Sequence, residues 1–146
     1  KKTKSLSQLI PLLDYHQACD AKSHIDAIRE QGSYGDELLI SISTILLPEL
    51  SDEAFALKMA NESMMPEIKV NDVLVIEPKI SPNPGDYVAV KVANKSEAVI
   101  CQYKKLSYTS PEFELQTLNE NWPNVNLTDA LELTVIGKVM QKIHQY

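Results

Sequence analysis

The chain has 146 residues, a formal net charge of −6 at pH 7 and a sequence pI near 5.0. This length fits one domain, and the hydrophobic fraction of 44% and charged fraction of 23% are ordinary for a globular protein. The acidic balance argues against DNA binding by this segment itself, and no apolar run is long enough to predict a membrane span.

The cysteine and histidine content predicts neither a metal site nor another cofactor. Cys19 and Cys101 would need histidine partners to bind zinc, and the three histidines show no metal-ligand spacing. So few cysteines, with no secretory signal at the start of the chain, are typical of a reduced protein. We therefore expect a cytoplasmic location.

One helix is predicted near the start of the chain, over residues 20–32. Asp20 is a suitable N-cap, and Gly32 is a suitable residue to end the helix. At helical spacing, Ala21, Ile25 and Ile28 share one apolar side.

The rest of the chain is dominated by short runs of β-branched and aromatic residues between turn residues. Residues 81–86 (SPNPGD) predict a turn at Gly85, residues 93–97 predict a hairpin connection, and Gly137 predicts a bulge or a close backbone approach. The fold class is therefore mainly β, a single strongly bent sheet assembly with one short helix. The predicted strands are 55–60, 72–78, 86–93, 97–105, 112–118 and 133–143.

Residues 61–72, NESMMPEIKVND, place a serine in a turn-rich segment. Serine is a weak nucleophile unless a base takes its proton. This segment resembles the nucleophile segment of the LexA-like self-cleaving repressors, in which a Gly-Asp-Ser-Met-x-Pro run precedes an Asp-Gly-Asp turn. Ser63, Met64 and Pro66 match that run, which makes Ser63 the candidate nucleophile.

Two positions of this segment depart from the family pattern. Asn61 and Asn71 stand where the family has glycine. Asparagine is the non-glycine residue that best tolerates a left-handed backbone, so we expect both turns to survive the exchange.

The resemblance extends along nearly the whole chain and in the family's order. It implies the sheet architecture of LexA and the signal peptidases, although a signal peptidase would need a membrane anchor. Residues 82–92 and 118–123 resemble phage-repressor segments, and residues 9–19 resemble the stretch that holds the bond these proteins cut in themselves. The implied divisions are a linker remnant at 1–8 and a LexA-like domain at 9–146, with a cleavage-segment-like region at 9–50 and a peptidase-like core at 51–146.

In this family the base is a lysine on a strand, in a stretch like Ala-Thr-Phe-Lys-Gln-Tyr. Residues 98–103 match that stretch, and they put Cys101 at the lysine position. Lys104 is an odd number of residues from Cys101 and points to the opposite face of a strand, whereas Lys105 lies roughly 13 Å farther along. A general base works at about 3 Å. We therefore predict that the serine–lysine dyad is lost.

The bond to be cut is altered as well. The family cleaves Ala-Gly or Cys-Gly, and the matching pair here is Ala18–Cys19, whose second side chain obstructs attack. By this resemblance Cys19 and Cys101 lie close together, either as a redox-linked pair or as two reduced thiols. A triad of Ser63 with His24 or His144 has no supporting spacing.

These observations predict the C-terminal dimerisation and regulatory domain of a prophage-type transcriptional repressor that does not cleave itself. Its partners would be a second copy of the chain and an antirepressor protein, with DNA bound only through an upstream domain. The alternatives are an active serine autopeptidase with another base, and an accessory subunit resembling the mutagenesis polymerase protein of the same family. Residues 133–143 either pair with another subunit or form an internal strand, and Trp122–Pro123 either seats a partner or packs as a loop.

Overall fold

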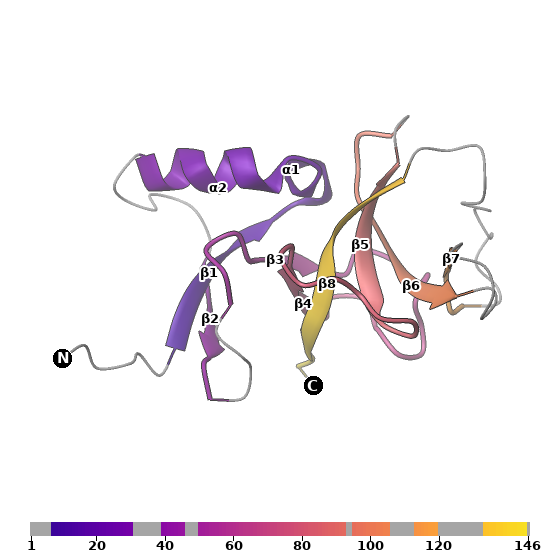
Figure 1. Ribbon diagram of the computed structural model, residues 1–146. Helices are drawn as coiled ribbons and strands as arrows, with labels where there is room; N and C mark the ends of the chain where they lie inside the picture. The colour runs from indigo at the N-terminus through magenta and orange to yellow at the C-terminus, as the bar shows by residue number, and fades with distance from the viewer. Residues whose placement is uncertain are drawn as a thin grey trace.

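The computed structural model describes residues 7–30, 39–45, 50–92, 95–105, 113–119 and 133–145. Its strands form one sheet in the order β2-β1-β3-β4-β8-β5-β6-β7 (Figure 1). Neighbouring strands are antiparallel except β1 and β3, which are parallel. The elements are β1 (Ser7–Leu13), α1 (Tyr15–Ala18), α2 (Ala21–Glu30), β2 (Leu39–Ser43), β3 (Phe55–Lys58), β4 (Val73–Glu77), β5 (Tyr87–Val92), β6 (Val99–Lys105), β7 (Phe113–Gln116) and β8 (Leu133–Ile143).

The predicted mainly β class is confirmed, and all six predicted strands are present with ends shifted by at most a few residues. The predicted helix corresponds to α2. The structure adds β1, β2 and α1, so the described chain has two helices rather than one. α1 begins at a reciprocal capping box, in which Asp14 and Gln17 each accept a hydrogen bond from the other's backbone N–H.

The two faces of the sheet carry separate hydrophobic clusters. Where β5 pairs with β6, Ala89 and Ile100 point to one face, and Val88 and Cys101 point to the other. The first face carries the helix-side cluster, whose buried members are Leu13, Ala18, Ala21, Ile25, Phe55, Leu57, Met59, Met64, Ile68, Leu74, Ile76, Ala89, Ala98 and Ile100. The second carries the valine cluster, made of Val88, Val90, Val92 and Cys101 with Tyr103 and Val135 packed against them. It also carries a third cluster, whose buried members are Ile10, Ile42, Leu50, Ala54, Ala56 and Val75.

β8 is an internal strand, paired with β4 on one side and β5 on the other. The interpretation of residues 133–143 as an internal strand is confirmed, because Leu133–Lys138 pair with β5 and Lys138–Ile143 pair with β4. Pairing of this strand with another subunit stays a prediction. In Figure 1 the strand crosses the middle of the sheet, with its last residues below.

Gly137 occupies the crowded crossing of β8 with β4. A Cβ atom there would lie 2.8 Å from Ile76 Cγ2 and 3.0 Å from the Glu77 carbonyl carbon. The β4–β8 register shifts at Val75/Ile76. The prediction of a close backbone approach at Gly137 is confirmed.

Gly137→Ala should destabilise the fold by about 1–3 kcal/mol, because the methyl group would collide with the buried Ile76 side chain and with the Glu77 backbone. Urea unfolding followed by circular dichroism measures this change. Ser41→Ala, at an exposed position of β2, is the control and should stay within about 0.5 kcal/mol of the parent. Equal stabilities for the Gly137→Ala variant and the parent would contradict the crowding described here.

Candidate functional site

Ser63 lies in a loop that joins β3 to β4, and the loop is closed at its base by backbone hydrogen bonds. Met59 N–H donates to the Asp72 carbonyl at 2.7 Å, and Asn71 N–H donates to the Met59 carbonyl at 2.8 Å. Asn71 has φ of 76°, the left-handed conformation expected for a residue in a glycine position. We call residues 59–72 the serine loop.

Ser63 is 4% exposed and is held through its backbone. Its N–H donates to Asn61 Oδ1 at 3.1 Å, and its carbonyl accepts from Asn119 N–H at 2.9 Å. Asn119 also donates from Nδ2 to the Glu62 carbonyl at 2.9 Å. Asn61 therefore serves as a side-chain acceptor and does not adopt the left-handed backbone that we expected of it.

Asn119 is a site residue that the sequence analysis did not single out. It belongs to the 118–123 stretch that carried part of the family resemblance, which is the signal that could have pointed to it. Trp122 and Pro123 of the same stretch lie outside the described residues.

Buried methionine and isoleucine side chains anchor the serine loop to the sheet. Met64 is 0% exposed and Ile68 is 2% exposed, and both belong to the helix-side cluster together with Ile100. Pro66, between them, is exposed and follows a cis peptide bond. The loop therefore packs over the helix-side face of β5 and β6.

Cys101 lies on the other face of the sheet. Its side chain is fully buried in the valine cluster, opposite Val88 on the neighbouring strand. Burial raises the pKa of this thiol to about 12, so it stays protonated at physiological pH. The thiol therefore points to the face opposite to that of Ile100, and the predicted placement of Cys101 beside the Ser63 hydroxyl stays a prediction.

Lys104 is on the same side of β6 as the serine loop. Strand alternation places it on the face of Ala98, Ile100 and Gln102, opposite to the face of Cys101. Lys104 is exposed, and the backbone of Ser63 donates to Asn61 and accepts from Asn119 rather than contacting a lysine. Within the described ranges, then, no lysine nitrogen is hydrogen-bonded to the candidate nucleophile.

The bond that matches the family's cleavage position lies at the end of α1. Ala18 is 1% exposed and packs in the helix-side cluster, and Cys19 N–H donates to the His16 carbonyl at 3.2 Å. The Tyr15 carbonyl accepts from Ala98 N–H at 2.9 Å, which ties α1 to the residue before β6. The Ala18–Cys19 peptide is thus part of a packed helical turn.

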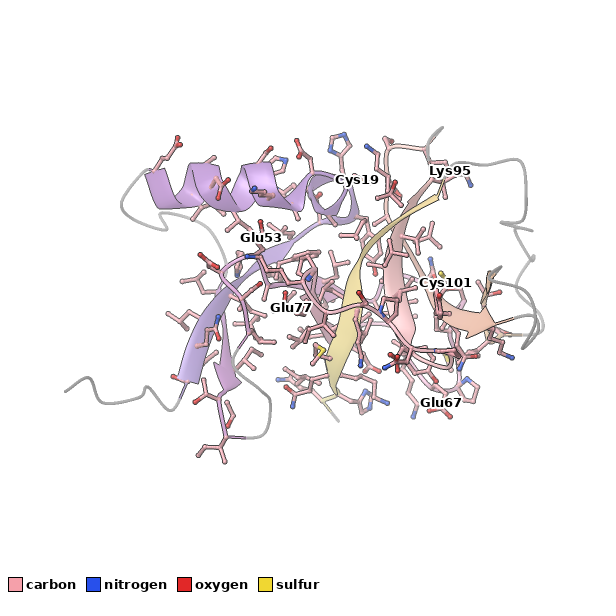
Figure 2. All side chains as sticks on the ribbon, viewed as in Figure 1. Cys19, Glu53, Glu67, Glu77, Lys95 and Cys101 are labelled. Carbon is pink, nitrogen blue, oxygen red and sulfur yellow. The ribbon has the colours of Figure 1, made fainter. Side chains whose placement is uncertain are left out.

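Cys19 and Cys101 are both free thiols, and they do not meet. Cys19 packs against the helix-side cluster, whereas Cys101 belongs to the valine cluster. Figure 2 shows Cys19 beside α1 and Cys101 farther down, on β6. The expected proximity of the two cysteines is therefore wrong.

Asp72, the residue that closes the serine loop, has a side chain only 1% exposed. Its Oδ1 contacts Nδ1 of His144, and its Oδ2 accepts from Lys69 N–H at 2.8 Å. Burial raises the pKa of Asp72, but the hydrogen bonds from His144 and Lys69 outweigh it, so the pKa lies below its usual value. His144 thus binds Asp72, which gives no support to a triad with Ser63.

The described residues contain neither a membrane-spanning helix nor a metal-binding cluster. They contain no helix long and apolar enough to cross a membrane. They also contain no group of three His, Cys, Asp or Glu side chains that could hold a metal ion.

The lowered pKa of Asp72 has a defined consequence for stability. A carboxyl group whose pKa is lower in the folded state stabilises the fold above its unfolded pKa of 3.8, and this stabilisation is lost as the pH falls through the folded pKa. Asp72→Asn should therefore cost about 1–3 kcal/mol at pH 7. Urea unfolding between pH 7 and pH 3 should show the difference from the parent shrinking toward the acid end. A difference that is constant over this range would contradict the account.

The model of the family described as Peptidase S24-like matches residues 11–140. That range includes the end of β1, the Ala18–Cys19 bond, the serine loop and most of β8. No curated protein matches the chain. Because the match covers most of the sequence, the chain belongs to the Peptidase S24-like family.

Proposed function

We propose that this chain is the regulatory and assembly domain of a LexA-type transcriptional repressor of prophage origin, and that it does not cut itself. The observation that carries the proposal is the environment of Ser63, which is buried, is held through its backbone by Asn61 and Asn119, and has no lysine hydrogen-bonded to it within the part of the chain that the structure describes. A serine hydroxyl without a base is a poor nucleophile.

The state of the Ala18–Cys19 peptide supports the same proposal. Its N–H donates within α1, and Ala18 is packed against the sheet. A nucleophile has to reach the carbonyl carbon of the bond it attacks. In addition, the residue after Ala18 carries a side chain, where the resemblance implies glycine.

In this role the domain holds two repressor chains together, and DNA is contacted by a domain upstream of it. Pairing makes the second operator contact effectively intramolecular, which raises avidity without new contacts. The net charge of −6 fits a domain that leaves DNA binding to another part of the protein. The free thiols fit a reducing compartment, the cytoplasm, and without self-cleavage an antirepressor protein would provide release from the operator.

A second candidate function, self-cleavage by Ser63 with Lys104 as base, is favoured by one observation. Lys104 shares the face of β6 on which Met64 and Ile68 anchor the serine loop. Cleavage would require the lysine side chain to reach Ser63 and the Ala18–Cys19 peptide to leave α1. An accessory subunit of the mutagenesis polymerase is the further alternative, and the reading frame upstream of Lys1 distinguishes it from a repressor by the presence of a helix-turn-helix.

Self-cleavage is tested by incubating the purified chain from pH 7 to pH 10 and measuring intact mass. We expect an intact chain, because none of the described lysines is hydrogen-bonded to Ser63. Two fragments divided between Ala18 and Cys19 would contradict the proposal. Ser63→Ala and Lys104→Ala are the matched controls, and loss of the fragments in both would establish the serine–lysine alternative.

The Cys101→Lys variant tests whether a lysine at position 101 can act as the base for Ser63. Because position 101 faces the valine cluster, the new ammonium would be buried without a partner and should cost about 3–5 kcal/mol, with no gain of cleavage. Thermal unfolding and intact mass measure the two effects. A stable variant that cuts at Ala18–Cys19 would show instead that position 101 faces the nucleophile.

A further inference from the structure

We infer that the C-terminal end of β8 is a positioning element for Ser63, with His144 acting through Asp72 and Lys142 acting through Glu67. This inference rests on the proposed function only in taking the serine loop as the functional centre, and it holds whether or not the chain cuts itself.

The first step is the closure of the loop. Met59 and Asp72 bring the two ends of the serine loop together, and Asp72 is the last loop residue before β4. The 69–72 turn is closed twice, since Asp72 N–H donates to the Lys69 carbonyl at 3.1 Å and Asp72 Oδ2 accepts from Lys69 N–H. The Asp72 side chain therefore sets how this end of the loop leaves the sheet.

The second step is the contact with β8. Asp72 Oδ1 contacts Nδ1 of His144, and because the aspartate side chain is only 1% exposed, this contact is little weakened by solvent. Val73 and Ile143, the neighbours of the two residues, pair across β4 and β8. The contact thus joins the base of the loop to the end of β8 that pairs with β4.

The third step is a second contact farther into the loop. Lys142 Nζ donates to the Glu67 carbonyl at 2.7 Å, between the anchors Met64 and Ile68. Lys142 is exposed, so we expect this contact to be the weaker of the two. The His144 contact holds the serine loop at its end, and the Lys142 contact holds it near its middle. Both contacts come from the C-terminal end of β8.

His144 can be replaced without opening a hole in the core. It is half-buried and borders a cavity that is also lined by Lys58, Asn71 and Gln145. A smaller side chain at position 144 therefore removes the contact with Asp72 without removing a member of any of the three hydrophobic clusters.

The test uses the reactivity of a thiol at the nucleophile position. In a Ser63→Cys variant, alkylation of Cys at position 63 by iodoacetamide at pH 8 is followed by peptide mass spectrometry. Adding His144→Ala should raise its alkylation rate about ten- to a hundredfold, because a hydrogen bond to a charged group in the closed loop is lost. Lys142→Met should give a smaller increase. His144→Asn keeps an N–H near the position of Nδ1, so its alkylation rate should stay close to that of the Ser63→Cys variant alone.

Cys101 supplies an internal control for unfolding, because it is fully buried in the valine cluster. Its alkylation rate should not change in any of these variants. Lys138→Met removes another cation of β8, one that pairs with Asp86 at 3.2 Å. This control substitution should leave the alkylation rate at position 63 unchanged.

Two results would overturn the inference. One is an unchanged rate at position 63 in the His144→Ala variant. The other is a rise at position 63 matched by an equal rise at Cys101, since that would be global unfolding rather than movement of the loop. Neither result depends on cleavage, so the proposed function and this inference can fail separately.

Discussion

Side chains that follow one another along a strand point to opposite faces of the sheet, and this constraint places the neighbours Ile100 and Cys101 of β6 in different hydrophobic clusters. The serine loop is anchored on the helix-side face by Met64 and Ile68. A side chain on β6 can meet it only if it points to that face. Ile100 does so, whereas the thiol of Cys101 is directed into the valine cluster. A shift of one residue in the strand register would exchange these two roles.

Two buried carboxylates flank β4, and each fixes the chain segment beside it. Asp72 precedes the strand and closes the serine loop. Glu77 ends the strand, is 2% exposed, and accepts from Ser51 N–H at 2.6 Å, Ser51 Oγ at 2.7 Å and Lys79 N–H at 3.0 Å. A charged acceptor with several donors makes strong hydrogen bonds, and losing it would leave those donors unpaired. Both ends of β4 are therefore held by polar contacts in addition to the core.

Local sequence patterns predicted the regular strands and α2, since alternation, capping and turn residues act over a few positions. β1 escaped prediction because Pro11 interrupts an apolar run, and proline inside a strand argues against a strand. The contact of Asp72 with His144 could not be predicted, because no local pattern joins residues that far apart in the chain. The motif around Ser63 pointed to the serine loop, but which face of β6 the loop covers depends on how Met64 and Ile68 pack.

Two obstacles oppose self-cleavage, and their sizes can be compared. α1 is a single turn, too short to be stable alone, and it is held by the bonds from Tyr15 Oη to the Lys58 carbonyl and from Ala98 N–H to the Tyr15 carbonyl, each 2.9 Å. Breaking both costs about 1–3 kcal/mol, which lowers a rate by about ten- to a hundredfold. An absent general base lowers it by about a hundred- to ten-thousandfold. The helix therefore delays cleavage, whereas the approach of an amine to Ser63 decides whether cleavage occurs at all.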